Sequence, residues 1–124
     1  MGANHMRNKI DSSNEHNHQV GLLFWFRTKY PDTLCFAIPN GSWRDIRTAK
    51  KLKDEGVTRG IPDLYIPRYH LWIEVKTPIG KLSKEQIEMH RYLISIGDFV
   101  IVAMGAEDGS RKILSFLSQK PKQL

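Results

Sequence analysis

A short alternating run, Leu71–Lys76, constrains the fold of this chain more than any other stretch. Successive side chains of a β-strand point to opposite faces, so Glu74 and Lys76 should share one face while the aliphatic residues between them enter a core. A second apolar run at residues 63–66 precedes it, across a short break that contains a proline. The two runs predict a hairpin that brings Asp63 close to Glu74.

Two carboxylates beside an ammonium group suggest a specific chemistry. Asp63 and Glu74 could hold a divalent cation, while Lys76 presents positive charge to a phosphate, an arrangement suited to metal-assisted phosphodiester hydrolysis. Simpler interpretations stay open on these residues alone. Asp63 after Pro62 could be a turn residue, and Glu74 and Lys76 could form an ion pair on an exposed strand, which contributes little to stability.

The composition favours a polyanionic partner. The formal net charge is +6 and the sequence pI is about 9.6, and a basic surface attracts nucleic acid first, although a solvated surface with surplus lysine gives the same totals. Cys35 is the only cysteine, which excludes an internal disulfide and a cysteine zinc cluster. No run is long and apolar enough to span a membrane, and residues 1–18 are too polar for a secretory signal. A reducing intracellular compartment fits these features best, and we expect a cytoplasmic protein.

Periodicity and punctuation predict a single α/β domain over residues 1–124, with flexible ends at 1–11 and 118–124. The predicted order is α-β-α-β-β-α-β, a small mixed sheet flanked by helices. The predicted helices start at Ser12 or Ser13, at Ser42 and at Ser83, and the predicted strands are 34–38, 63–66, 71–76 and 99–103. The continuous apolar run 99–103 predicts a central strand buried on both faces. Residues 110–117 fit a last helix or strand equally well.

Polar side chains on the apolar faces of two predicted helices add to the candidate site. Glu15 and Gln19 share a face with Leu22 and Phe26 on the first predicted helix. On the third predicted helix, Gln86 lies at the centre of an arc of mainly apolar side chains. These are Ile87, Met89, His90, Leu93, Ile94 and Ile96. An inward polar group costs stability unless it is paired. Glu15 and Gln86 could instead complete capping boxes, and His90 is expected to be a hydrogen-bonded core histidine.

Taken in order, these residues resemble a known family. The pattern Asp63…Glu74-x-Lys76 after Pro62 resembles the PD-(D/E)xK nuclease superfamily. The wider set resembles its VRR-NUC (virus-type replication-repair nuclease) domain of the stand-alone phage or bacterial type, over roughly residues 15–103. That type implies the cytoplasm of a bacterium or of a phage-infected host cell. The elements of that set are Glu15-x-x-x-Gln19, Asn40-Gly41, Gly60-Ile61-Pro62-Asp63-Leu64, Glu74-Val75-Lys76 and Leu82-Ser83-x-x-Gln86.

The resemblance implies a restriction-endonuclease-like core and assigns roles to the candidate metal-binding and catalytic residues. Asp63, Glu74 and the Val75 carbonyl would bind Mg²⁺ or Mn²⁺, and Glu15 would complete the metal site. Lys76 would position or deprotonate the attacking water, or neutralise charge on the phosphorane, and Gln86 would line the site.

The function implied is that of a metal-dependent, structure-specific DNA endonuclease, acting as a homodimer on branched DNA such as four-way (Holliday) junctions or flaps. The alternatives are a catalytically silent DNA-binding module of the same fold, and a nicking or restriction-type nuclease of the same superfamily. Apolar residues offered for the dimer contact are Phe24, Trp25, Ile113, Leu114, Phe116 and Leu117. The alternative is that they cover the core of their own chain. Predicted nucleic-acid-binding residues are Gln19, Asn40, Arg44, Lys50, Lys53 and Arg59.

Overall fold

The computed structural model describes residues 14–39 and 46–120, without the side chains of residues 46 and 47. The helices are α2 (Glu15–Lys29), α3 (Ile46–Asp54), α4 (Lys84–Ser95) and α5 (Ala106–Ser118). The strands are β1 (Phe36–Ala37), β2 (Leu64–Ile66), β3 (Leu71–Lys76) and β4 (Phe99–Met104). The predicted element order is confirmed, and the undecided C-terminal segment is the helix α5.

Within the described residues the strands form one mixed sheet in the order β1-β2-β3-β4. β2 and β3 form the predicted antiparallel hairpin, with Leu64 opposite Ile73, and a 3₁₀ turn at Pro67–Tyr69 joins them. β4 runs parallel to β3 and places Val102 opposite Glu74. The prediction of a central position for residues 99–103 is wrong, because β4 lies at the edge of the sheet and 43% of Phe99 is exposed.

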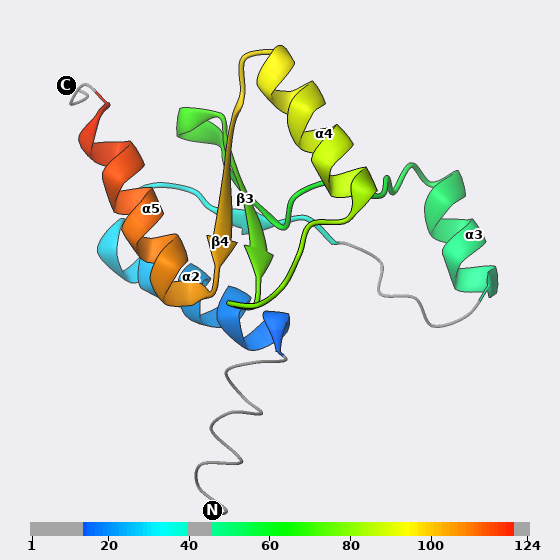
Figure 1. The fold of residues 1–124 in the computed structure, drawn as a ribbon, viewed down its shortest axis with the longest axis horizontal. Coiled ribbons are helices and arrows are strands. Elements are labelled where there is room, and N and C mark those ends of the chain that lie inside the picture. The colour runs from blue at the N-terminus through cyan, green and yellow to red at the C-terminus, as the bar shows by residue number, and fades with distance from the viewer. Residues whose placement is uncertain (1–13, 40–45, 121–124) are drawn as a thin grey trace, which may run out of the picture.

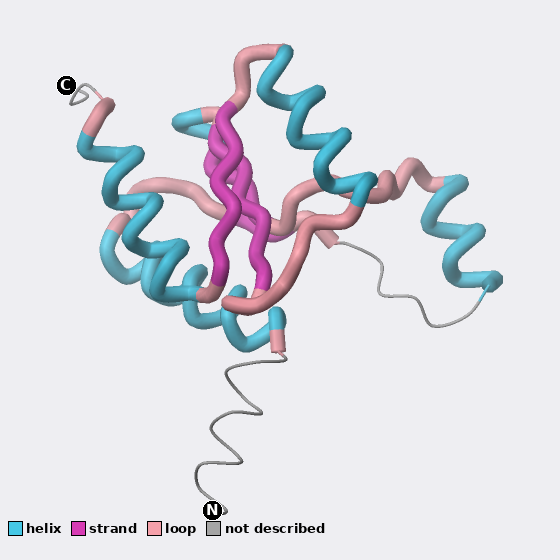
Figure 2. The backbone as a smooth tube through the Cα atoms, viewed as in Figure 1, coloured by secondary structure: helices cyan, strands magenta, loops and turns pink. Residues whose placement is uncertain are grey.

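Helices cover both faces of the sheet. α2 and α5 lie together on one side of β3 and β4, and α4 lies on the other (Figure 1). The core fills the α2/α5 side, where alternate residues of β3 meet Leu22 and Phe26 of α2 and Ile113 of α5. The tube view shows α3 standing apart from these layers, at the far side of α4 (Figure 2).

The lengths of several elements depart from the sequence prediction. Strand 34–38 is reduced to Phe36–Ala37, because it pairs only with the short β2. Asn14 caps α2 by accepting a hydrogen bond from the Asn17 backbone N–H, so Glu15 is the first helical residue and not the partner in a capping box. On α4 the predicted inward arc is too wide. Its outer members are exposed, namely Ile87, Ile94 and Ile96.

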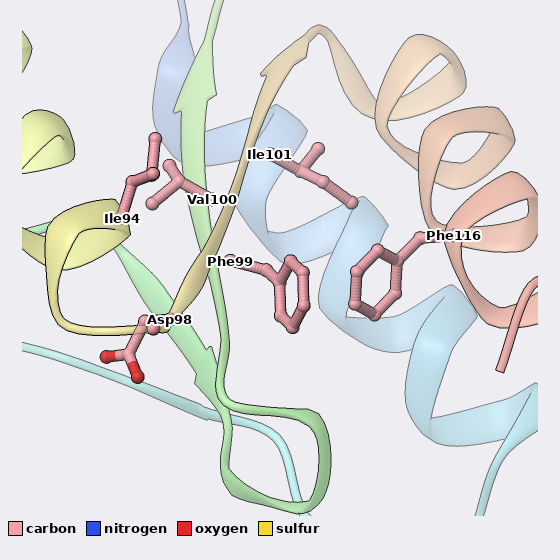
Figure 3. A pocket seen from close by; sticks show the side chains of 7 residues that line it. Ile94, Asp98, Phe99, Val100, Ile101 and Phe116 are labelled. Carbon is pink, nitrogen blue, oxygen red and sulfur yellow. The ribbon is translucent and has the colours of Figure 1, made fainter.

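The free edge of β4 is covered by side chains of α5 near its end and adjoins an open hollow near its start. Near its end α5 satisfies outward backbone groups: the Met104 N–H donates to Asp108, and Lys112 donates to the Val102 carbonyl at 2.7 Å. Near its start lies an apolar hollow of about 470 Å³, where the rings of Phe99 and Phe116 meet edge to face (Figure 3). The bonds from Asp108 and Lys112 cover backbone groups of this edge strand and so protect it from pairing with other chains.

None of the helices described is long and apolar enough to cross a membrane.

Candidate metal and phosphate site

The predicted approach of Asp63 to Glu74 is confirmed. Asp63 immediately precedes β2, and its Oδ2 accepts a hydrogen bond from the Val75 backbone N–H at 2.7 Å. This bond ties the start of one hairpin strand to the end of the other and turns the Asp63 carboxyl toward the Glu74 side chain. Asp63 also makes a side-chain hydrogen bond with Glu74. Two acidic groups therefore share one location at the end of β3.

Glu74 is buried and is held by two residues of α4. Only 1% of its surface is exposed. Gln86 donates from Nε2 to Oε2 at 3.2 Å, and Nε2 of His90 lies 3.0 Å from Oε1. Gln86 also completes a capping box, because its Oε1 accepts from the Ser83 N–H while its own N–H donates to the Ser83 hydroxyl. The two interpretations open for Gln86 are thus both satisfied by one side chain.

The electrostatics of Glu74 are unusual for a carboxyl group. Its pKa is raised from 4.5 to about 9, chiefly by burial and then by the charge of Asp63 and the hydrogen bond with it, while Lys76 acts in the opposite direction. Burial also lowers the pKa of His90, and the positive charge of Lys76 adds to that effect. Without an added cation, both groups therefore favour their neutral forms near neutral pH.

Lys76 is directed to a different carboxylate. Its side chain is buried, and its Nζ lies 3.9 Å from Oε2 of Glu15, which stands half-exposed at the start of α2. The first turn of α2 ends close to the end of β3 (Figure 1). Glu15, Asp63, Glu74 and Lys76 thus form one cluster, in which the single ammonium group does not directly pair with the buried Glu74.

The loop before Asp63 is fixed against α4. Gly60 has φ +87°, and a Cβ at this position would stand 2.5 Å from the Glu85 carbonyl oxygen. Only glycine combines that backbone conformation with such a close approach. The loop that leads to Asp63 and the helix end that carries Gln86 are therefore positioned by one contact.

The donor chemistry of the cluster fits a hard divalent cation. Mg²⁺ and Mn²⁺ prefer carboxylate, carbonyl and water oxygens, and Asp63, Glu74 and Glu15 supply the first kind. A strand residue directs its N–H and C=O to the same side. Because the Val75 N–H points at Asp63, its carbonyl faces the same side and is a suitable fourth donor. In the described ranges, no group of three or more His, Cys, Asp or Glu side chains already stands in metal-binding geometry.

The predicted nucleic-acid-binding residues are dispersed. Gln19 lies half-buried on α2, one turn after Glu15. Lys50 and Lys53 are exposed on α3, where Lys50 pairs with Asp54 at 2.9 Å, and Arg59 is exposed in the loop before Gly60. Asn40 and Arg44 lie outside the described residues.

Two histidines contribute more than the sequence suggested. His90 is the hydrogen-bonded core histidine that was predicted, but its partner is Glu74. Its spacing of four residues from Gln86 was the signal that could have placed it in the site. His18 is half-buried and accepts a hydrogen bond at Nδ1 from the Ala106 N–H at 3.0 Å, which joins α2 to α5.

Comparison with protein-family models, curated proteins and solved structures finds no match to this chain. The resemblance to the VRR-NUC domain therefore depends on its motif residues alone. The hollow of Figure 3 is separate from the cluster, because it adjoins the start of β4 whereas the carboxylates gather at the end of β3.

Proposed function

We propose that this protein is a Mg²⁺- or Mn²⁺-dependent, structure-specific DNA endonuclease of the PD-(D/E)xK superfamily, similar to the VRR-NUC type and acting on branched DNA. The observation that carries the proposal is the contact between Asp63 and the buried Glu74, next to Lys76, on a protein of net charge +6. Two acidic groups that share one location are unfavourable unless one takes up a proton or a cation binds between them.

Each residue of the cluster has a distinct task in this proposal. The cation, once bound by Asp63, Glu74, Glu15 and the Val75 carbonyl, would polarise a phosphate and activate a water molecule. Asp63 is oriented by the Val75 N–H, and Glu74 is oriented from α4. Lys76 is largely shielded from solvent, so its ammonium group would act with little screening on the negative charge of the phosphorane oxygens.

The experiment that tests this function is a panel of DNA substrates: duplex, single strand, flap, fork and four-way junction. We expect cleavage with Mg²⁺ or Mn²⁺ that stops on chelation and is highest on branched substrates. Asp63→Ala, Glu74→Ala and Lys76→Ala should each abolish it. Glu88→Ala, which removes an exposed carboxylate from α4, is the matched control and should cut normally.

Other outcomes separate the alternatives. DNA binding without cleavage, in folded wild-type protein with either metal, would identify a silent binding module. Cutting that follows a base sequence and ignores branching would indicate a restriction-type enzyme. Undiminished cleavage by folded Glu74→Ala protein would contradict the proposed mechanism.

We also propose that the active form is a homodimer, since a two-fold pair supplies two identical sites for paired cuts. The residues available for the contact differ from those first considered. Ile113 is fully buried, and Phe116, Leu117 and Trp25 pack on the core of their own chain. Phe24, 69% exposed on α2, is the clearest remaining contact residue.

A further inference from the structure

Glu74 is held at both of its oxygens by one face of one helix. Gln86 and His90 are four residues apart on α4, so their side chains lie one above the other. Gln86 engages Oε2 and His90 engages Oε1, at 3.2 Å and 3.0 Å. The last torsion of a glutamate side chain has a broad preference, and two separate bonds remove that freedom.

The surroundings make this hold strong. Exposure is 1% for Glu74 and 7% for His90, so water competes poorly for either group. Burying a histidine here lowers stability unless its ring nitrogens form hydrogen bonds. The buried Leu93 on the next turn shows that the same face of α4 also accepts an aliphatic residue. The hydrogen bond to Glu74 therefore explains why a polar ring is buried at position 90.

We propose that His90 is a positioning residue that, together with Gln86, orients the Glu74 carboxylate for a divalent cation. The inference rests on the function proposed above and adds a residue to its machinery. The His90 ring with a proton on Nε2 donates to Oε1. A carboxylate offers about four lone-pair directions, so the two bonds from α4 leave others for the cation. Partners that orient a metal ligand in this way typically change metal affinity by about 10- to 100-fold when they are removed.

The test measures Mn²⁺ binding to the full chain by titration calorimetry, separately from cleavage. His90→Leu should bind Mn²⁺ about 10- to 100-fold more weakly than the wild type. His90→Gln should restore most of the affinity, because the glutamine amide nitrogen reaches the position of Nε2. Leu93→Ala is the control for a purely structural loss: it removes a buried side chain from the same helix, so it should lower the melting temperature and leave Mn²⁺ affinity unchanged.

Cleavage kinetics supply a second measurement. His90→Leu should lower kcat with little change in the KM for DNA, because His90 lies behind Glu74 and away from the substrate. If His90→Leu does not fold, His90→Asn replaces it, since the shorter amide does not reach Glu74 and should show the same loss.

Three results would overturn the inference, and they are distinguishable. Wild-type Mn²⁺ affinity in folded His90→Leu or His90→Asn would refute the role of His90 alone. Equal losses in His90→Gln and His90→Leu would show that ring packing, and not the hydrogen bond, matters. Absence of Mn²⁺ binding by the wild type would overturn this inference and the proposed nuclease function together.

Discussion

Replacing Glu74 by glutamine should stabilise the metal-free protein while it removes the proposed activity. Burial, with the charge of Asp63 added, raises the pKa of Glu74 from 4.5 to about 9. Between these two values the folded protein keeps a proton that the unfolded chain has released. The free energy of unfolding of the wild type therefore falls as pH rises from 4.5 toward 9. Glutamine does not ionise, so the variant lacks this loss.

The size of the effect follows from the same values. A pH of about 7.5 lies about three units above 4.5. At roughly 1.4 kcal/mol per unit, the wild type has there lost about 4 kcal/mol of its free energy of unfolding. At about pH 5 the wild type has lost less than about 1 kcal/mol of its free energy of unfolding in this way. The amide oxygen can still accept from Gln86, and the amide NH₂ can donate to Asp63 or to His90. For a domain of this length, a gain of about 4 kcal/mol corresponds to roughly 15 °C in melting temperature.

The assay is urea denaturation of both proteins with a chelator, at about pH 7.5 and about pH 5. The Glu74→Gln variant should exceed the wild type at the higher pH and nearly equal it at the lower one. Added Mn²⁺ should then stabilise the wild type and not the variant. A variant that is less stable at about pH 7.5, or that gains equally at both values, would refute the account of Glu74 as a buried carboxyl that favours its neutral form.

Three further predictions concern the edges of the site and the assembly. Glu15→Gln should greatly reduce cleavage with little change in melting temperature. The reason is that Asn14 caps α2 and the half-exposed ion pair of Glu15 with Lys76 contributes at most about 1 kcal/mol to stability. Normal cleavage by this variant would exclude Glu15 from the proposed metal site. Reversing charge at Lys50 and Lys53 together should weaken DNA binding and flatten its salt dependence, and an unchanged slope would mean that α3 faces away from DNA. Sedimentation equilibrium should give about twice the chain mass of 14.4 kDa, and Phe24→Asp should shift the mass toward the monomer; a wild type that is monomeric at micromolar concentration would rule out the dimer.

The parts of the site that could be predicted are those set by local geometry. Alternation in Leu71–Lys76 and the nearby run before it were enough to predict the hairpin and the approach of Asp63 to Glu74. The capping signal at Ser83 fixed the start of α4, and from it the inward direction of Gln86. These relations join residues at most about a dozen positions apart, where strand and helix periodicity decides the outcome.

The parts that could not be predicted depend on how distant elements dock. The run 99–103 is apolar enough for a central strand, and only its pairing with β3 alone places it at the edge. Helical periodicity turned His90 inward but did not identify Glu74 as its partner, because that depends on where α4 crosses β3. The same holds for Lys76 and Glu15, which meet through the docking of α2.

The bond between His18 and the Ala106 N–H has a consequence for how the protein is made. It joins residues 88 positions apart, and α2 packs on α5 and on β3. Contacts this distant in sequence form late, because the chain entropy of closing the loop must be met first. We therefore expect α2 to dock only after α5 has been synthesised, so Glu15 reaches Lys76 late in folding. A chain truncated before α5 would contain every motif residue and still lack an assembled cluster, so we expect it to lack the proposed cutting activity.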